Sequence, residues 1–112
     1  MRRQVLGSAH VDRAAAHTTA FNKDFQELIT RYAWGEIWTR PGLDVRTRRI
    51  LAIGTLLALG HWDELRMHVR AALTEGGFSA DDIKEVFLHQ TLYVGVPAVN
   101  HAFAHVSDLV RS

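Results

Sequence analysis

Apolar side chains recur along this chain at intervals of three and four residues, the spacing that places them on one face of a helix. No stretch of useful length alternates apolar and polar residues as a strand does. The pattern predicts helices, which we place at residues 11–18, 23–38, 44–59, 62–75, 79–94 and 97–110. We therefore expect an all-α fold, a bundle of about six helices.

Short polar or glycine-containing segments separate the predicted helices and indicate where several of them end. Asp44 is suited to cap an N-terminus, and Ser79 with Asp82 has the spacing of a capping box. The Gly76–Gly77 pair predicts a left-handed cap at the end of the fourth helix. Because none of these segments resembles a linker and no repeat is visible, residues 1–112 predict a single domain.

The third predicted helix differs from the others, because residues 50–59 are apolar on every side. We expect such a helix to be central and surrounded by the other helices. The segment is far shorter than the roughly twenty residues that span a bilayer, and the start of the chain lacks the pattern of a signal peptide. We therefore expect a cytoplasmic protein with no membrane partner.

The composition narrows the range of possible functions. Apolar residues make up 47% of the 112 residues and charged residues 22%, which is typical of a globular chain. The net charge is +1 with neutral histidines, so no strong field attracts nucleic acid or an anionic membrane. The chain has no cysteine, which excludes disulfides, thiolate nucleophiles, zinc–thiolate sites and iron–sulfur clusters.

The fourth predicted helix carries an unusual set of ionisable residues. His61, Glu64 and His68 fall on one face at about 100° per residue, on or beside the side that should pack against the apolar third helix. Burying these groups unpaired would cost several kcal/mol. They are therefore either structural groups that satisfy one another, or groups lining a cavity with pKa values suited to proton transfer.

Three arginines, Arg46, Arg48 and Arg49, lie within one turn near the start of the third helix, where the helix dipole disfavours positive charge. An acidic group nearby should therefore offset their positive charge. The guanidinium fork suits bidentate binding of a carboxylate or phosphate, so an anionic ligand is one interpretation. A salt bridge to Glu36 or to an acid of another helix is the other.

Other polar and aromatic residues give weaker indications. His101 and His105 have the i, i+4 spacing of a helical metal site, but no third ligand is evident in the sequence, and we expect no metal. Trp34 and Trp38 are core or subunit contacts, or the wall of a pocket. Gln90 lies on the apolar stripe of the fifth helix, where its amide needs a hydrogen-bond partner.

Together, long blocks of this sequence resemble the γ-carboxymuconolactone decarboxylase family. The matching blocks are residues 5–7, 9–14, 25–43, 46–48, 64–72, 84–86, 95–98 and 100–103. They extend over essentially the whole chain, which makes the resemblance far more specific than a short catalytic pattern.

The resemblance implies a small helical fold shared with alkylhydroperoxidase-D-like proteins, a ring assembly that is usually a homohexamer, and catalysis without a cofactor. In redox relatives the equivalent helix carries a Cys-x-x-Cys-x-x-x-His pattern, which here becomes His61-x-x-Glu64-x-x-x-His68. The final histidine is kept while both thiols are replaced, so acid–base chemistry remains and peroxidase chemistry does not. Val94 stands where many such decarboxylases have cysteine, and Arg49 where serine is common.

The implied reaction removes carbon dioxide from γ-carboxymuconolactone, a small dicarboxylate lactone, and gives β-ketoadipate enol-lactone in aromatic catabolism. Electrons released with the carbon dioxide flow to the conjugated lactone carbonyl, so neither a cofactor nor a metal is required. The enzyme must hold two carboxylates, stabilise the charge on the lactone oxygen and deliver one proton. We assign His68 as the proton donor, with Glu64 orienting it or sharing the proton and His61 as a hydrogen-bond donor to substrate.

Substrate binding is assigned to residues of the second and third helices. Arg46 and Arg48 are expected to bind the carboxylate that the substrate retains. A departing carboxylate that is strongly bound would stay charged, so an apolar wall from Trp34 or Leu57 should face it. Because so small a helical unit hardly encloses a pocket, we expect the site at a subunit boundary.

Two alternatives stay open. One is a decarboxylase or isomerase of another small unsaturated acid on the same scaffold. The other is a non-catalytic oligomeric binding protein, in which His61, Glu64 and His68 form a buried hydrogen-bonded cluster.

Overall fold

The computed structural model describes residues 1–110, and every regular element within that range is helical. The α-helices are α1 (Arg2–Leu6), α2 (Ser8–Ala16), α3 (Lys23–Ile29), α4 (Val45–Leu59), α5 (Trp62–Thr74), α6 (Ala80–Val94) and α7 (Val96–Val106). A π-helix, η1 (Thr30–Ile37), continues α3, and a 3-10 helix, η2 (Ser107–Leu109), follows α7. The predicted all-α class is confirmed.

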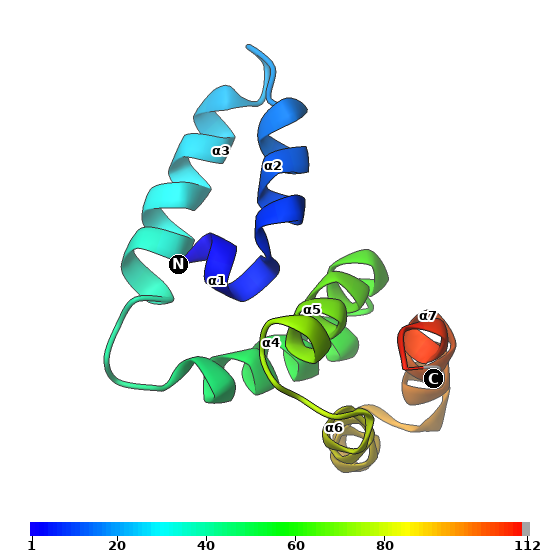
Figure 1. Cartoon of the computed structure of the whole chain (residues 1–112). Coiled ribbons are helices and arrows are strands. Elements are labelled where there is room, and N and C mark those ends of the chain that lie inside the picture. The colour runs from blue at the N-terminus through cyan, green and yellow to red at the C-terminus, as the bar shows by residue number, and fades with distance from the viewer. Residues whose placement is uncertain (111–112) are drawn as a thin grey trace.

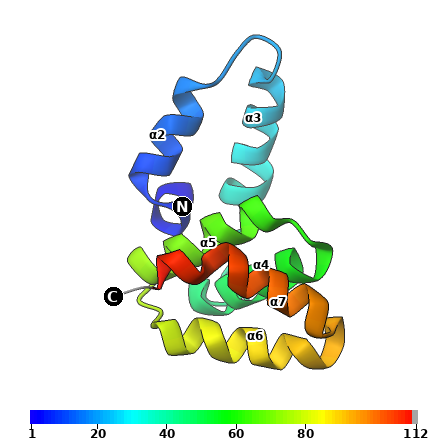
Figure 2. The same cartoon turned by 90° about the vertical axis from the view of Figure 1, so that its right-hand side faces the viewer.

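The molecule has a body and a projecting arm. Helices α4 to α7 pack together as the body, whereas α2 and α3 form a hairpin that stands away from it, with α1 at the base of the hairpin (Figures 1 and 2). None of the helices described is long and apolar enough to cross a membrane. The arm is joined to the body through α1, which packs against α5.

The N-terminal prediction is wrong in its boundaries. One helix was expected at residues 11–18, but α1 and α2 occupy the segment from Arg2 to Ala16. Gly7 separates them with a φ of +88°, a conformation that glycine adopts without strain. The short α1 exists because Val5 and Leu6 are buried against the rest of the chain. A helix of this length has no stability of its own, so its sequence pattern carries little information.

The predicted capping residues at the helix ends are confirmed. The Asp44 side chain accepts a hydrogen bond from the Thr47 backbone N–H at 2.7 Å, as an N-cap should. Ser79 and Asp82 form both bonds of the capping box at the start of α6. Gly77, after the end of α5, has a φ of +70°, in the left-handed region that was predicted.

Helix α4 is only half as enclosed as its sequence suggests. Ile53 and Leu57 are fully buried in the main core, whereas Leu51 is 55% exposed and Leu59 is 63% exposed. The expectation that other helices of the same chain would surround this helix is therefore wrong. One apolar side of α4 faces outward within the described chain.

Two apolar clusters hold the fold together. The main core joins α4, α5, α6 and α7, and it includes Ile53, Leu65, Phe87 and Ala102. The smaller cluster consists of Val5, Leu6 and Trp34, with Trp38 and Met67 packed against it. It ties α1 and η1 to α5, and the candidate site lies beside it.

Candidate functional site

His68 is the one residue of the predicted catalytic set that the fold places in its interior. It lies on the inward side of α5 among Leu65, Val69 and Ala72, and it is only 8% exposed. Its ring stacks on Trp38 at 6.2 Å between centroids, with an angle of 14° between the planes.

Two indole rings are stacked one behind the other beside this imidazole. Trp38, which contacts His68, stacks in turn on Trp34 at 5.4 Å. Trp34 is 9% exposed and belongs to the smaller apolar cluster. Trp38 makes the ring contact with His68, and Trp34, which was predicted as part of an apolar wall, stacks on Trp38.

The surroundings of His68 keep it uncharged. Burial is the largest effect, and the positive charges of Arg49 and His10 add to it, so that the pKa of His68 falls to about 4. The imidazole is therefore neutral at pH 7. Its Nδ1 atom is buried and has no hydrogen-bond partner among residues 1–110. A buried polar atom without a partner costs free energy, which a ligand could recover by bonding to it.

Arg49 is the neighbour that sequence reasoning left undecided. Its side chain is 3% exposed and donates hydrogen bonds to two backbone carbonyls at the end of α1, Val5 O at 2.9 Å and Gln4 O at 3.1 Å. Burial lowers the pKa of Arg49, and the carboxylate of Glu75 opposes this effect. Arg49 thus holds α1 in place and puts a positive charge near His68.

The other two groups on the predicted catalytic face do not meet His68 within the chain. Glu64 and His61 are exposed, and no hydrogen bond or ion pair joins either of them to His68 in the described residues. His61 is the N-cap residue of α5. The reason is helical geometry, since the buried stripe of α5 is centred on Leu65 and Val69 and includes only the last member of the set.

The predicted carboxylate ligands also lie apart from His68. Arg46 forms an ion pair with Asp82 of α6 at 3.4 Å, and its guanidinium lies 4.2 Å from the centre of the Phe78 ring. Of the two interpretations of the arginines, a salt bridge to another helix is therefore seen for Arg46. Arg48 donates to the carbonyls of Leu43 and Arg40 at 3.3 and 3.2 Å.

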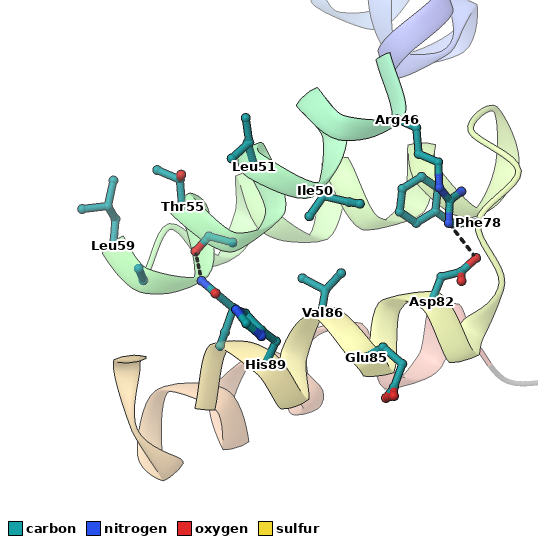
Figure 3. Close-up of a pocket in the computed structure, with 13 residues that line it drawn as sticks. Arg46, Ile50, Leu51, Thr55, Leu59, Phe78, Asp82, Glu85, Val86 and His89 are labelled. Carbon is teal, nitrogen blue, oxygen red and sulfur yellow. Dashed lines mark hydrogen bonds and ion pairs between the residues drawn. The ribbon is translucent and has the colours of Figure 1, made fainter. Parts of the chain in front are cut away.

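Arg46 belongs instead to a cavity of about 750 Å³ between α4 and α6 (Figure 3). Its walls are mostly apolar, and Asp82, Glu85 and His89 come from α6. Gln90 donates to the carbonyl of Gly54 at 3.1 Å, which supplies the partner that its amide was expected to need. His68 is not among the residues that line this larger cavity.

The histidine pair of α7 contacts an aromatic ring. The rings of His101 and His105 stack on Trp62 at 5.8 and 5.2 Å. Nowhere in residues 1–110 do three histidine, aspartate or glutamate side chains gather as a metal site would require.

These features define a small all-helical protein whose interior offers an imidazole stacked on an indole, with the charge of a buried guanidinium near it, and no thiol. The chain belongs to the carboxymuconolactone decarboxylase family, whose model matches residues 23–108. The resemblance stated from the sequence is thereby confirmed.

Two relatives match most of the chain. It is 49% identical over 110 residues to a 4-carboxymuconolactone decarboxylase of Acinetobacter baylyi, covering 98% of this chain and 81% of that protein. It is 41% identical over 98 residues to the nitrosuccinic acid decarboxylase npaB of Metarhizium robertsii, covering 88% of this chain and 68% of that protein. Both relatives are named as decarboxylases, but of different acids.

Proposed function

We propose that this protein is a carboxy-lyase that converts 4-carboxymuconolactone to β-ketoadipate enol-lactone without a cofactor. The near-complete match to a 4-carboxymuconolactone decarboxylase supports the substrate. The observation that carries the chemistry is the buried, neutral imidazole of His68, which stacks on Trp38 and lies near the charge of Arg49, and whose Nδ1 atom has no hydrogen-bond partner in residues 1–110.

In the proposed reaction the bond between the ring carbon and its carboxylate breaks, and carbon dioxide leaves. The electron pair moves through the ring alkene to the lactone carbonyl oxygen and gives a dienolate. A proton is then added to a ring carbon, and the double bond is left in its new position. Stabilising the oxygen charge and supplying this proton are the tasks of the protein.

His68 supplies the proton in this scheme. A neutral imidazole is a poor acid, but a substrate with two carboxylates brings negative charge next to it and raises its pKa. Binding of the substrate therefore takes up a proton, which His68 then gives to the dienolate. The indole of Trp38, backed by Trp34, forms an apolar wall against which a carboxylate is poorly solvated and leaves more readily.

The exposed groups of α5 take part only in an assembly. We propose a ring-shaped homo-oligomer, a homohexamer by family resemblance, in which a neighbouring subunit covers Glu64 and His61 and brings them into the site. Large apolar side chains exposed on α3 and α6 support such an assembly, among them Phe25 at 59% and Leu92 at 77%. A cytoplasmic location stays a prediction.

The test is turnover by the His68→Gln variant, which removes proton transfer and keeps a polar side chain of similar size. We expect the loss of the lactone's ultraviolet absorbance and the release of carbon dioxide to slow by 10²- to 10⁴-fold. His89→Gln, in the larger cavity, is the matched control and should keep full activity. Retention of more than about a tenth of the rate by a folded His68→Gln protein would remove His68 from the role.

A second candidate is decarboxylation of another small acid, which the relative that acts on nitrosuccinic acid favours. Assaying the wild-type protein with both acids separates the two proposals. If neither acid loses carbon dioxide while the assembly is intact, a non-catalytic binding protein is the better explanation.

A further inference from the structure

A second, smaller cavity lies where α1, α2 and α5 meet. Its volume is about 380 Å³. The basic side chains in its walls are His10 and Arg13 from α2, with Arg66 and Arg70 from α5. Figure 2 shows α1 and the start of α2 lying over α5 at the base of the arm.

Two of these arginines are not neutralised by the chain. Arg66 is bound to both carboxylate oxygens of Asp108 at 2.6 Å, so its charge is offset. Arg13 and Arg70 form no ion pair within residues 1–110. Asp63 and Glu75 also line the cavity, but neither is paired with these arginines.

The pKa of His10 is lowered partly by the arginines around it. After burial, the charges that lower its pKa are those of Arg2, Arg13 and Arg70, all of them cations. Gathering like charges around an imidazole is unfavourable unless an anion joins them. The Nε atom of Arg2 is itself buried without a hydrogen-bond partner in the described chain.

The cavity meets α5 at residues on either side of the proposed proton donor in the sequence, although His68 itself is not among its lining residues. Met67 and Ala71 line it, and they lie on α5 immediately before His68 and three residues after it. His10, in the cavity wall, is close enough for its charge to lower the pKa of His68. Arg49 fixes α1, which covers this region, through its bonds to Val5 and Gln4.

We propose that this cavity binds the carboxylate that the substrate retains, through Arg13 and Arg70 with His10 beside them. The inference rests on the proposed function, and it replaces Arg46 and Arg48 as the ligands of that carboxylate. The retained carboxylate then lies among cations while the departing one lies against the indole of Trp38. This is the division that decarboxylation requires, because a departing carboxylate held by cations would be stabilised against loss.

The larger cavity between α4 and α6 does not suit this ligand. Its one arginine, Arg46, is already paired with Asp82, and the nearby Glu85 adds a second negative charge. The smaller cavity instead has three arginines beside the carboxylates of Asp63 and Glu75. A dianionic substrate would be repelled there.

The experiment measures binding of furan-2-acetate, which carries the retained arm of the substrate on a ring without a departing carboxylate. Its uncharged amide, furan-2-acetamide, is the matched probe. Calorimetry on the full-length protein should show that the acid binds at least tenfold more tightly than the amide. In the double variant Arg13→Gln/Arg70→Gln this preference should fall to nearly one, whereas in Lys84→Gln, an exposed cation on α6, it should persist.

Three outcomes would overturn the inference: no preference for the acid in the wild-type protein, a preference that survives in the double variant, or a preference abolished by Arg46→Gln. Loss of structure is monitored by circular dichroism, and the single variants Arg13→Gln and Arg70→Gln give smaller changes in the same direction if the double variant does not fold.

Because the protein does not turn the probes over, this experiment tests the binding site independently of the proposed decarboxylase activity. A wild-type protein that prefers the acid through Arg13 and Arg70 but does not decarboxylate the lactone supports the binding site and contradicts the activity. A protein that decarboxylates the lactone with KM unchanged in the double variant supports the activity and contradicts the binding site, because loss of a uniform binding interaction raises KM.

Discussion

His68 makes the stability of the protein depend on pH in a direction that can be worked out. Its pKa is about 4 in the folded chain, against an ordinary value of 6.5, so between these values the unfolded chain binds more protons. The free energy of unfolding should therefore fall as the pH drops from 6.5 toward 4, by up to about 3 kcal/mol from this residue.

Urea titrations across that range check this expectation. A His68→Phe variant should show a flatter dependence than the wild-type protein, because it has no proton to gain at this position. His89→Gln, which replaces an exposed histidine, is the matched control for the loss of an imidazole. Parallel curves for wild type and His68→Phe would contradict the neutral, buried state of the imidazole.

For single residues, the sequence predicts that His68 is unusual, but it does not predict which side chains surround it. His68 was expected on an inward face because of its spacing, and it is there. Glu64 lies one turn earlier, yet it falls at the edge of the buried stripe, where a rotation of the helix decides its exposure. Arg49 comes near His68 from α4 and His10 comes from α2, and no local pattern encodes the approach of such distant residues.

At the scale of elements, the contact of α4 with α6 depends on a glycine. A Cβ atom at Gly54 would lie 2.9 Å from the Nε2 atom of Gln90, which donates to the carbonyl of the same glycine. We expect Gly54→Ala to displace this amide and to lower the free energy of unfolding by about 1–3 kcal/mol. Urea denaturation measures the loss.

The Gln90→Ala variant provides the control for this contact. Once the amide is gone, the added methyl group has nothing to displace, so the double variant should lose less than the sum of the single variants. Strictly additive losses would show that the methyl group acts elsewhere.

The attachment of α1 depends on Arg49. Replacement by methionine leaves the carbonyls of Val5 and Gln4 without their buried donor, and we expect a loss of about 2–4 kcal/mol in the free energy of unfolding. Removing the Arg49 charge should also raise the pKa of His68, because that charge is the second-largest cause of the lowered pKa. Nuclear magnetic resonance titration of His68 checks the direction, and Arg48→Met should leave that pKa nearly unchanged.

Elements with strong local signals were predictable and those held by distant contacts were not. Asp44 and the Ser79 capping box act within one turn, so their sequence is sufficient. Helix α1 forms because Val5 and Leu6 reach α5 and η1. The π-helical form of residues 30–37 is likewise invisible in a periodicity of three and four.

For the whole molecule, the apolar surface left outside the core predicts association. Phe25 is 59% exposed, Leu28 49% and Tyr32 60%, and these residues follow one another at helical spacing along α3 and η1. Light scattering should give a mass several times that of one chain. Phe25→Glu/Tyr32→Glu should lower this mass, and Lys23→Glu, which adds the same side chain at an already polar position, should not. A monomeric, fully active wild-type protein would contradict the proposed assembly.

The arm formed by α2 and α3 should make the protein more sensitive to proteolysis at low concentration. Its turn at residues 17–22 is far from the body in both views, and Phe21 there is 97% exposed (Figures 1 and 2). If neighbouring chains shield this arm, dilution should uncover it, and a protease should then cut at the turn before it attacks the body. The rate of that first cleavage would report the dissociation of subunits, long before any change in helix content.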